Sequence, residues 1–243
     1  MLTDEEIKRI VAGTLSRSPA ADKSEAASPA VNESYSVEAK TASLATERLS
    51  DGNKRAHKEL HERYVDALNT ISAKLDTVKR GESSSNHSEF RSLKIDETYN
   101  HNGAYLHDLY FENISDLKSE ITVDSLAFMR LQRDFGDFDA WQRDFIACCM
   151  SSRCGWAITG YSVYLGRFIN ISVDLHSLDV PVGFLPVIVM DTWQHAYYRD
   201  YLSDVKSYTI AMMKELNWNV IDRRFKRIDA IVQAIKSTEV RNG

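Results

Sequence analysis

Hydrophobic positions at helical spacing mark the start of the chain. After an acidic first turn, residues 4–15 place Ile7, Ile10, Val11 and Leu15 on one face, which predicts a short amphipathic helix. The stretch that follows, SRSPAADKSEAASPAVNESYS, is rich in Ser, Ala and Pro and nearly without large apolar residues, the composition of a flexible tether. Two interpretations stay open for this N-terminal extension: a dispensable disordered tail, or a helix that docks on another protein.

Two further periodic stretches predict a helical hairpin. One long helix is expected over roughly residues 45–80, and a loop with Gly81 and a run of serines follows it. A second helix is expected over roughly residues 98–114. Two helices joined by a short loop form an antiparallel hairpin.

After about residue 120 the pattern alternates between helical and strand periods. Segments rich in β-branched and aromatic residues predict two strands paired around Gly166 and a third strand over FLPVIVMD. Helical patterns are found at residues 125–136, 138–152, 193–217 and 218–237. We therefore predict an α+β fold, in which an N-terminal antiparallel helical hairpin is followed by a C-terminal domain of helices around a small three-stranded antiparallel sheet. The expected divisions are a helix plus flexible tether (1–45), a hairpin domain (46–118) and an α+β domain with C-terminal helices (119–243).

Composition and charge limit the kinds of molecule that this chain is expected to bind. Of 243 residues, 43% are hydrophobic and 27% charged, and the net charge is −5, which argues against a nucleic-acid binder held by phosphate contacts. The longest apolar run, residues 180–190, contains two prolines and a glycine, so we expect no membrane span. Cys148, Cys149 and Cys154 form neither a disulfide framework nor a usual zinc motif, which favours the cytoplasm or another reducing compartment.

One pair of candidate ligands follows the third predicted strand. Asp191 and His195 stand four residues apart directly after the apolar run, and a strand end is a rigid place for such side chains. Carboxylate and imidazole together suit zinc, iron or manganese. Alone, this pattern is weak, because an Asp and a His lie this close by chance in many proteins.

Other candidates lie on the predicted hairpin. His57, His61 and Tyr64 point to one side of the long helix, since positions seven apart nearly eclipse at about 100° per residue. They could equally be solvated polar positions. His107 stands among aromatic residues and Leu, a setting in which a hydrogen-bonded core histidine is more common than a ligand.

Five ordered segments resemble the iron/manganese superoxide dismutase family. They are LHERYVDALN, NGAYLHDLYFENIS, DFGDFDAWQRDF, the GW at residues 155–156, and DTWQHAYYRDY followed by NW. The matches follow the family's order over roughly residues 49–225 with similar gaps. The resemblance implies the same α+β fold, one iron or manganese ion per chain, and dismutation of superoxide.

Carried over residue by residue, the resemblance also implies a site. His107, Asp191 and His195 match three metal ligands of the family. Tyr64 matches its gateway tyrosine beside the substrate funnel, and His176 matches the residue that hydrogen-bonds the metal-bound solvent, so these two are the implied catalytic residues. The implied pocket residues are His61, Trp156, Trp193, Gln194 and Tyr198.

The first metal ligand is where the sequence departs most from the family. The family's ligand stands eight residues before the gateway tyrosine, where this chain has Ala56, whereas His57 stands seven before. Either the helix has lost one residue after His57, which then serves as the ligand, or the ligand is gone. Since a straight helix aims His57 and Tyr64 the same way and a spacing of eight needs a bulge, we favour His57.

Other departures concern the family's dimer interface and entrance. Gln194 replaces a glutamate that bridges to the partner subunit's ligand histidine, while Tyr198 is present. The family's funnel histidine aligns with Leu60, or with His61 if the helix has lost a residue. The family's opening segment before the first helix is missing. These changes bear on turnover and on formation of a homodimer more than on the fold.

Two functions from different classes follow. The first is a metal-dependent superoxide dismutase, or a metal-binding relative, that acts on superoxide. The second is a non-catalytic dismutase-fold subunit of a larger assembly, such as a virion or a ribosome-like particle, docked through residues 4–15. A zinc hydrolase using His57 and His61 is disfavoured, because residue 58 is Lys and the glutamate base of zinc proteases is absent.

Overall fold

The computed structural model describes residues 31–114 and 119–241, and residues 31–243 form one compact unit. The helix predicted over residues 4–15 therefore lies outside the described residues. Within the described part of the chain, no helix is both long enough and apolar enough to cross a lipid bilayer.

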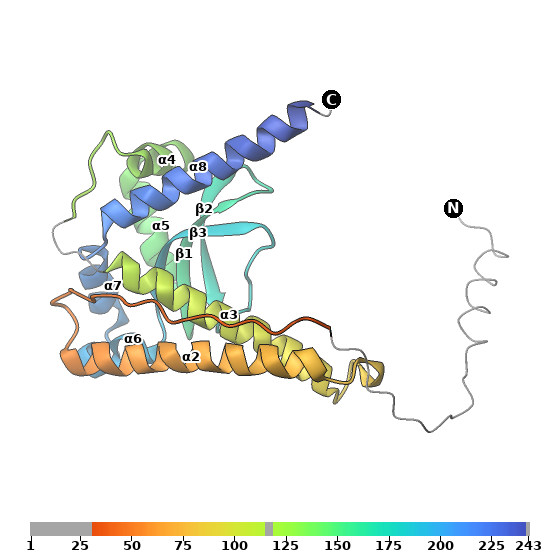
Figure 1. Ribbon diagram of the computed structural model, residues 1–243. Coiled ribbons are helices and arrows are strands. Elements are labelled where there is room, and N and C mark those ends of the chain that lie inside the picture. The colour runs from red at the N-terminus through yellow and green to blue at the C-terminus, as the bar shows by residue number, and fades with distance from the viewer. Residues whose placement is uncertain (1–30, 115–118, 242–243) are drawn as a thin grey trace, which may run out of the picture. The chain divides into compact units, whose positions relative to one another are not determined.

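The predicted helical hairpin is confirmed (Figure 1). It consists of α2 (Asp51–Thr77) and α3 (Glu89–Asn113), joined by a loop with a short 3-10 helix (Arg80–Glu82). Ser50 and Ser88 cap the two helices, because each side-chain oxygen accepts a backbone N–H of the first turn. The second helix begins nine residues earlier than the pattern predicted, since Ser88 caps it there.

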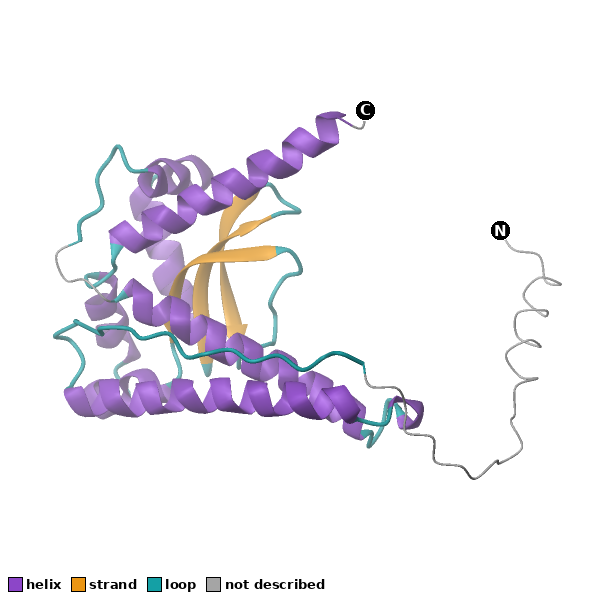
Figure 2. Ribbon diagram, in the orientation of Figure 1, coloured by secondary structure: helices purple, strands orange, loops and turns teal. Residues whose placement is uncertain are grey.

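The three predicted strands form one antiparallel sheet (Figure 2). They are β1 (Gly155–Ser162), β2 (Arg167–Asp174) and β3 (Phe184–Asp191), in the order β2-β1-β3. In this register Trp156 of β1 lies opposite Asp191 of β3. Gly155 beside it must be glycine, because a Cβ there would lie 1.8 Å from the carbonyl oxygen of Val173.

Helices enclose the sheet and complete the core. They are α4 (Leu126–Phe135), α5 (Phe138–Ser151), α6 (Gln194–Tyr201), α7 (Val205–Met213) and α8 (Trp218–Arg241). The stretch predicted as helical over 193–217 is split at Leu202, whose φ of 51° is incompatible with a continuous α-helix. The largest fully buried side chains include Trp141, Trp156 and Phe225.

A buried arginine joins three of these elements. Arg224 of α8 donates to the carbonyl oxygens of Val187 in β3 (2.9 Å) and Leu109 in α3 (3.0 Å). It also forms an ion pair with Glu112 at 2.8 Å. The last helix is thereby fastened to both the hairpin and the sheet.

Residues 33–40 lie along the helical hairpin, as the red-to-orange trace beside α2 in Figure 1 shows. The side-chain amide of Asn69 accepts from the backbone N–H of Val37 (2.8 Å) and donates to its carbonyl oxygen (2.9 Å). Ser72 bonds in the same way to both backbone groups of Tyr35. The fixed course of residues 33–40 differs from the flexible tether predicted from composition. Composition reveals the lack of apolar side chains, but it does not reveal hydrogen bonds between side chains of α2 and the backbone of this segment.

We expect Asn69→Ala to release this segment from α2. Two hydrogen bonds to Val37 are lost, which should lower the free energy of local opening by roughly 1–3 kcal/mol. Native-state hydrogen exchange at the Val37 amide measures this change directly. Thr70→Ala is the matched control, because its hydroxyl donates to the Asp66 carbonyl within the same helix; equal protection in the two variants would contradict the prediction.

Candidate metal centre

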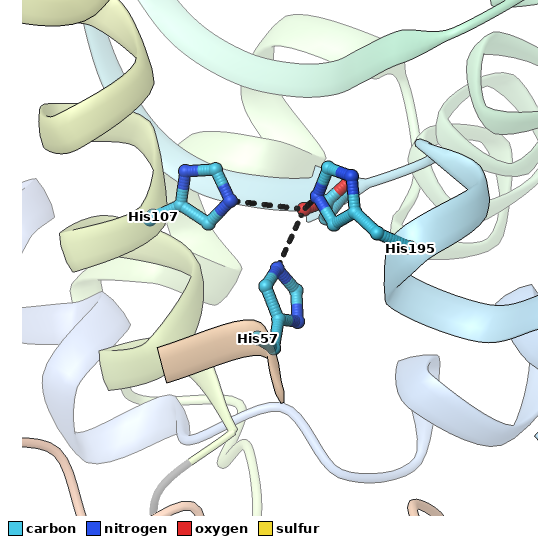
Figure 3. Close-up of side chains that lie close together, drawn as sticks. His57, His107 and His195 are labelled. Atoms are coloured by element: carbon cyan, nitrogen blue, oxygen red, sulfur yellow. Dashed lines mark hydrogen bonds and ion pairs between the residues drawn. The ribbon is translucent and has the colours of Figure 1, made fainter. Parts of the chain in front are cut away.

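Three histidine side chains from three elements point toward one another (Figure 3), and Asp191 from a fourth element completes the group. His57 comes from α2, His107 from α3, Asp191 from the end of β3 and His195 from the first turn of α6. The Oδ2 atom of Asp191 lies 3.0, 3.2 and 3.6 Å from the Nε2 atoms of His57, His195 and His107, respectively. One potential ligand atom from each residue lies within 4.8 Å of the others. This set is called the histidine–aspartate cluster below.

Asp191 is held from both sides. Its Oδ1 atom accepts the backbone N–H of Trp193 at 2.8 Å, which leaves Oδ2 for the histidines. Its backbone carbonyl accepts the hydroxyl of Tyr208 (2.8 Å), and that hydroxyl in turn lies 2.9 Å from the hydroxyl of Tyr110. The carboxylate is therefore fixed by both its main chain and its side chain. Sequence patterns gave no signal for either tyrosine.

His107 provides the test of whether a cation fits this cluster. Its Nδ1 lies 2.6 Å from the carbonyl oxygen of Gly103; a carbonyl only accepts, so the ring proton sits on Nδ1 and the neutral ring has a bare Nε2. That Nε2 is buried without a hydrogen-bond partner and faces the Asp191 carboxylate at 3.6 Å. A cation between these two electron-rich atoms would contact both, so the residues present fit a metal ion at this point. Three imidazole nitrogens and one carboxylate oxygen suit iron, manganese or zinc.

The charges of the cluster favour the same interpretation. Burial raises the pKa of Asp191, but the charges and hydrogen bonds of His195 and His57 outweigh it and hold that pKa well below its usual range. Burial lowers the pKa of His57 and, more strongly, that of His107. At neutral pH the site thus offers an ionised carboxylate at Asp191 and neutral imidazoles at His57 and His107, the forms that bind metal ions.

A second group of side chains lies beside the cluster. The indole N–H of Trp156 donates to Nδ1 of His176 at 3.0 Å, and Nε2 of His176 lies 2.8 Å from the hydroxyl of Tyr64. Trp156 packs edge-on against His107 at 5.0 Å between ring centroids. Gly103 makes room for this arrangement, because a Cβ there would lie 2.8 Å from Cδ1 of Tyr64.

The metal-free protein is expected to unfold more easily as the pH falls from about 6.5 to about 4. Burial lowers the pKa of His176 from 6.5 to about 4, so in this window the unfolded chain binds a proton that the folded chain excludes. We expect His176 alone to lower the free energy of unfolding by about 1 kcal/mol per pH unit, somewhat less than one fully excluded proton gives. Urea titrations at several pH values measure the slope.

His176→Gln should reduce the slope by the contribution of one proton, whereas His101→Gln should leave it unchanged, since His101 is exposed on α3. His57 and His107 contribute in the same direction, because burial lowers their pKa values too. A free energy of unfolding that stays constant across the window would contradict the assignment of neutral, buried histidines.

The remaining predicted pocket residues divide into two groups. Trp193 packs against His176 at 5.0 Å, and His61 is buried with its ring stacked on His107 at 5.9 Å. Nε2 of His61 lies 3.0 Å from the carboxylate of Asp108, without hydrogen-bond alignment. By contrast, Gln194 and Tyr198 are exposed on α6.

Comparisons with known proteins agree with this geometry. The family model for the C-terminal domain of iron/manganese superoxide dismutases matches residues 125–224. The chain is 34% identical over 194 residues to an iron superoxide dismutase of Aquifex pyrophilus, covering 78% of this chain and 90% of that protein. It is 28% identical over 171 residues to manganese superoxide dismutase 1 of Halobacterium salinarum, covering 70% of this chain and 83% of that protein.

Proposed function

The chain belongs to the iron/manganese superoxide dismutase family, and from this we propose that it converts superoxide to dioxygen and hydrogen peroxide at the histidine–aspartate cluster. The observation that carries the proposal is the bare, buried Nε2 of His107 facing the carboxylate of Asp191. The comparisons lend no support to the alternative of a non-catalytic subunit.

His57, His107, Asp191 and His195 would hold one iron or manganese ion. Such an ion supplies the exchange of electrons, since it alternates between its trivalent and divalent states. The choice of His57 over a vacant ligand position at Ala56 is supported by α2, which is α-helical from Asp51 to Thr77. In a straight helix, a residue seven positions before Tyr64 points to the same side, and His57 is buried in the cluster.

The surrounding side chains would control water and protons. Trp156 is fully buried and Trp193 half-buried, so their rings limit access of water to the cluster. Tyr64 would donate a proton to the peroxide that forms, because its hydroxyl is a weak acid held close to the cluster by His176. Burial raises the pKa of Tyr64, which keeps its proton in place at neutral pH.

The family resemblance also implies a homodimer. The exposed side chains of Gln194 and Tyr198 lie on one short helix beside His195, which supports dimerisation through that helix. The three free cysteines, Cys148, Cys149 and Cys154, fit a reducing compartment. A protein partner for residues 4–15 stays a prediction on residues outside the described part.

Metal content and superoxide consumption measured on one preparation test the proposed function. We expect about one iron or manganese ion per chain by elemental mass spectrometry, with turnover that His195→Ala abolishes. His101→Ala, an exposed histidine on α3, is the control and should retain both metal and turnover. A protein that binds no metal and leaves superoxide unchanged would refute the proposal.

A further inference from the structure

A cavity of about 500 Å³ lies where α3, α8 and the start of β3 meet. Figure 1 shows the two helices on either side of that strand, and both helices contact it. The volume is within the range of pockets that hold small organic molecules. None of the four residues of the histidine–aspartate cluster lines this cavity, so dismutation at the cluster makes no use of it.

Part of the cavity lining is apolar. Leu185 and Pro186 of β3 are half-buried there, and Ile228 of α8 is buried. Ile231, one turn further along α8, continues the same surface and is 39% exposed. These four residues are called the apolar lining below. A ligand with an apolar body is favoured here, because it would remove this surface from water.

The charged part of the lining is mainly basic. It consists of four cations and one carboxylate: Lys40, Arg223, Arg224, Arg227 and Glu112. Lys40 and Arg224 both form ion pairs with Glu112, at 3.4 and 2.8 Å. The chain as a whole carries a net charge of −5. A basic cavity in an acidic protein raises the local concentration of anions.

Arg223 and Arg227 have charges that no neighbouring acid neutralises. Within the described part of the chain, neither forms an ion pair, whereas Asp222 and Asp229 of the same helix pair with other cations. Residues four apart lie on one face of a helix, where two like charges are mildly destabilising. Both side chains are exposed. An anion that accepts hydrogen bonds from both guanidinium groups would remove this repulsion.

We propose that this cavity binds a small amphipathic anion, whose phosphate or carboxylate head group lies on Arg223 and Arg227 and whose apolar body covers the apolar lining. The planar guanidinium groups suit either head group, because each presents several N–H donors in one plane. A bare anion would leave the apolar lining uncovered, and a neutral hydrocarbon would leave the two arginines unpaired. Binding at this cavity does not depend on the proposed function, since no cluster residue takes part in it.

Isothermal titration calorimetry with monomeric octyl phosphate tests the proposal. We expect one molecule to bind per chain, and Arg227→Gln to weaken binding by about tenfold, the effect of losing one hydrogen bond to a charged group. Lys226→Gln is the matched control, because it removes one positive charge from the same helix but Lys226 does not line the cavity. It should change the affinity by less than about twofold. Inorganic phosphate, which has no apolar body, should bind at least about tenfold more weakly than octyl phosphate.

Methyl NMR spectra give a second readout that locates the ligand. Octyl phosphate should shift the δ1-methyl resonances of Ile228 and Ile231 but not that of Ile95, which is exposed on α3 and does not line the cavity. Equal weakening by the two substitutions, equal affinity for inorganic phosphate, or unshifted resonances of Ile228 and Ile231 would each overturn the proposal. So would a protein that does not bind octyl phosphate but sediments with phosphatidylglycerol vesicles, since the arginines would then contact a membrane surface.

Discussion

Replacing Asp191 with asparagine is expected to strip the cluster of its metal and to reduce superoxide consumption to background. Oδ2 of Asp191 lies within 3.6 Å of the Nε2 atoms of all three histidines. An amide keeps the shape of the side chain but removes the only negative charge of the cluster. Three imidazoles then face a cation without a carboxylate. We expect metal occupancy to fall below about one tenth, since even loss of an indirect contact costs tenfold or more in affinity.

The measurement is elemental analysis of desalted protein, paired with superoxide consumption on the same sample. Asp174→Asn is a matched control, because Asp174 also ends a strand of the sheet but lies 30% exposed near Arg153. That variant should keep its metal and its turnover. Retention of both by Asp191→Asn would remove this carboxylate from the site and with it the role assigned to the cluster.

Removing the metal is expected to lower the melting temperature by about 8–16 °C. A ligand present at a thousand times its dissociation constant stabilises a folded protein by about 4 kcal/mol, and one kcal/mol corresponds to about 2–4 °C for a domain of this size. The physical source is the contact between His107 and Asp191, which without a cation places a bare nitrogen against a carboxylate in a fully buried position.

Scanning calorimetry of chelator-treated protein, before and after reloading with manganese, measures this difference. Asp191→Asn should show one melting temperature whether or not metal is added, which separates binding at the cluster from weak surface binding. If the wild-type protein also melts at the same temperature in both states, the cluster does not bind metal tightly.

Much of the fold could be predicted because its elements carry strong local patterns. The three strands follow runs of β-branched and aromatic residues. Other features depend on contacts that no local pattern records. The break at Leu202 comes from one backbone angle, and the fixed course of residues 33–40 comes from side chains on α2. The division of the chain at residues 45 and 118 stays a prediction.

The candidate site was predictable to a similar degree. The resemblance to the family implied His107, Asp191 and His195 as ligands, whereas the residues alone gave only weak signals. Helix geometry favoured His57 over the position of Ala56, and one cluster contains all four residues. The support from Tyr208 was not predictable. A tyrosine hydroxyl that reaches the backbone carbonyl of Asp191 leaves no trace in the sequence around either residue.

Arg224 has a consequence for how the protein matures during synthesis. It fastens α3 to β3, the elements that carry His107 and Asp191, from a helix that contains no residue of the cluster. All four cluster residues precede Arg224 in the chain and leave the ribosome before it. We therefore expect a nascent chain to expose all four cluster residues before Arg224 links α3 to β3, so that the centre becomes rigid only after α8 has joined the fold.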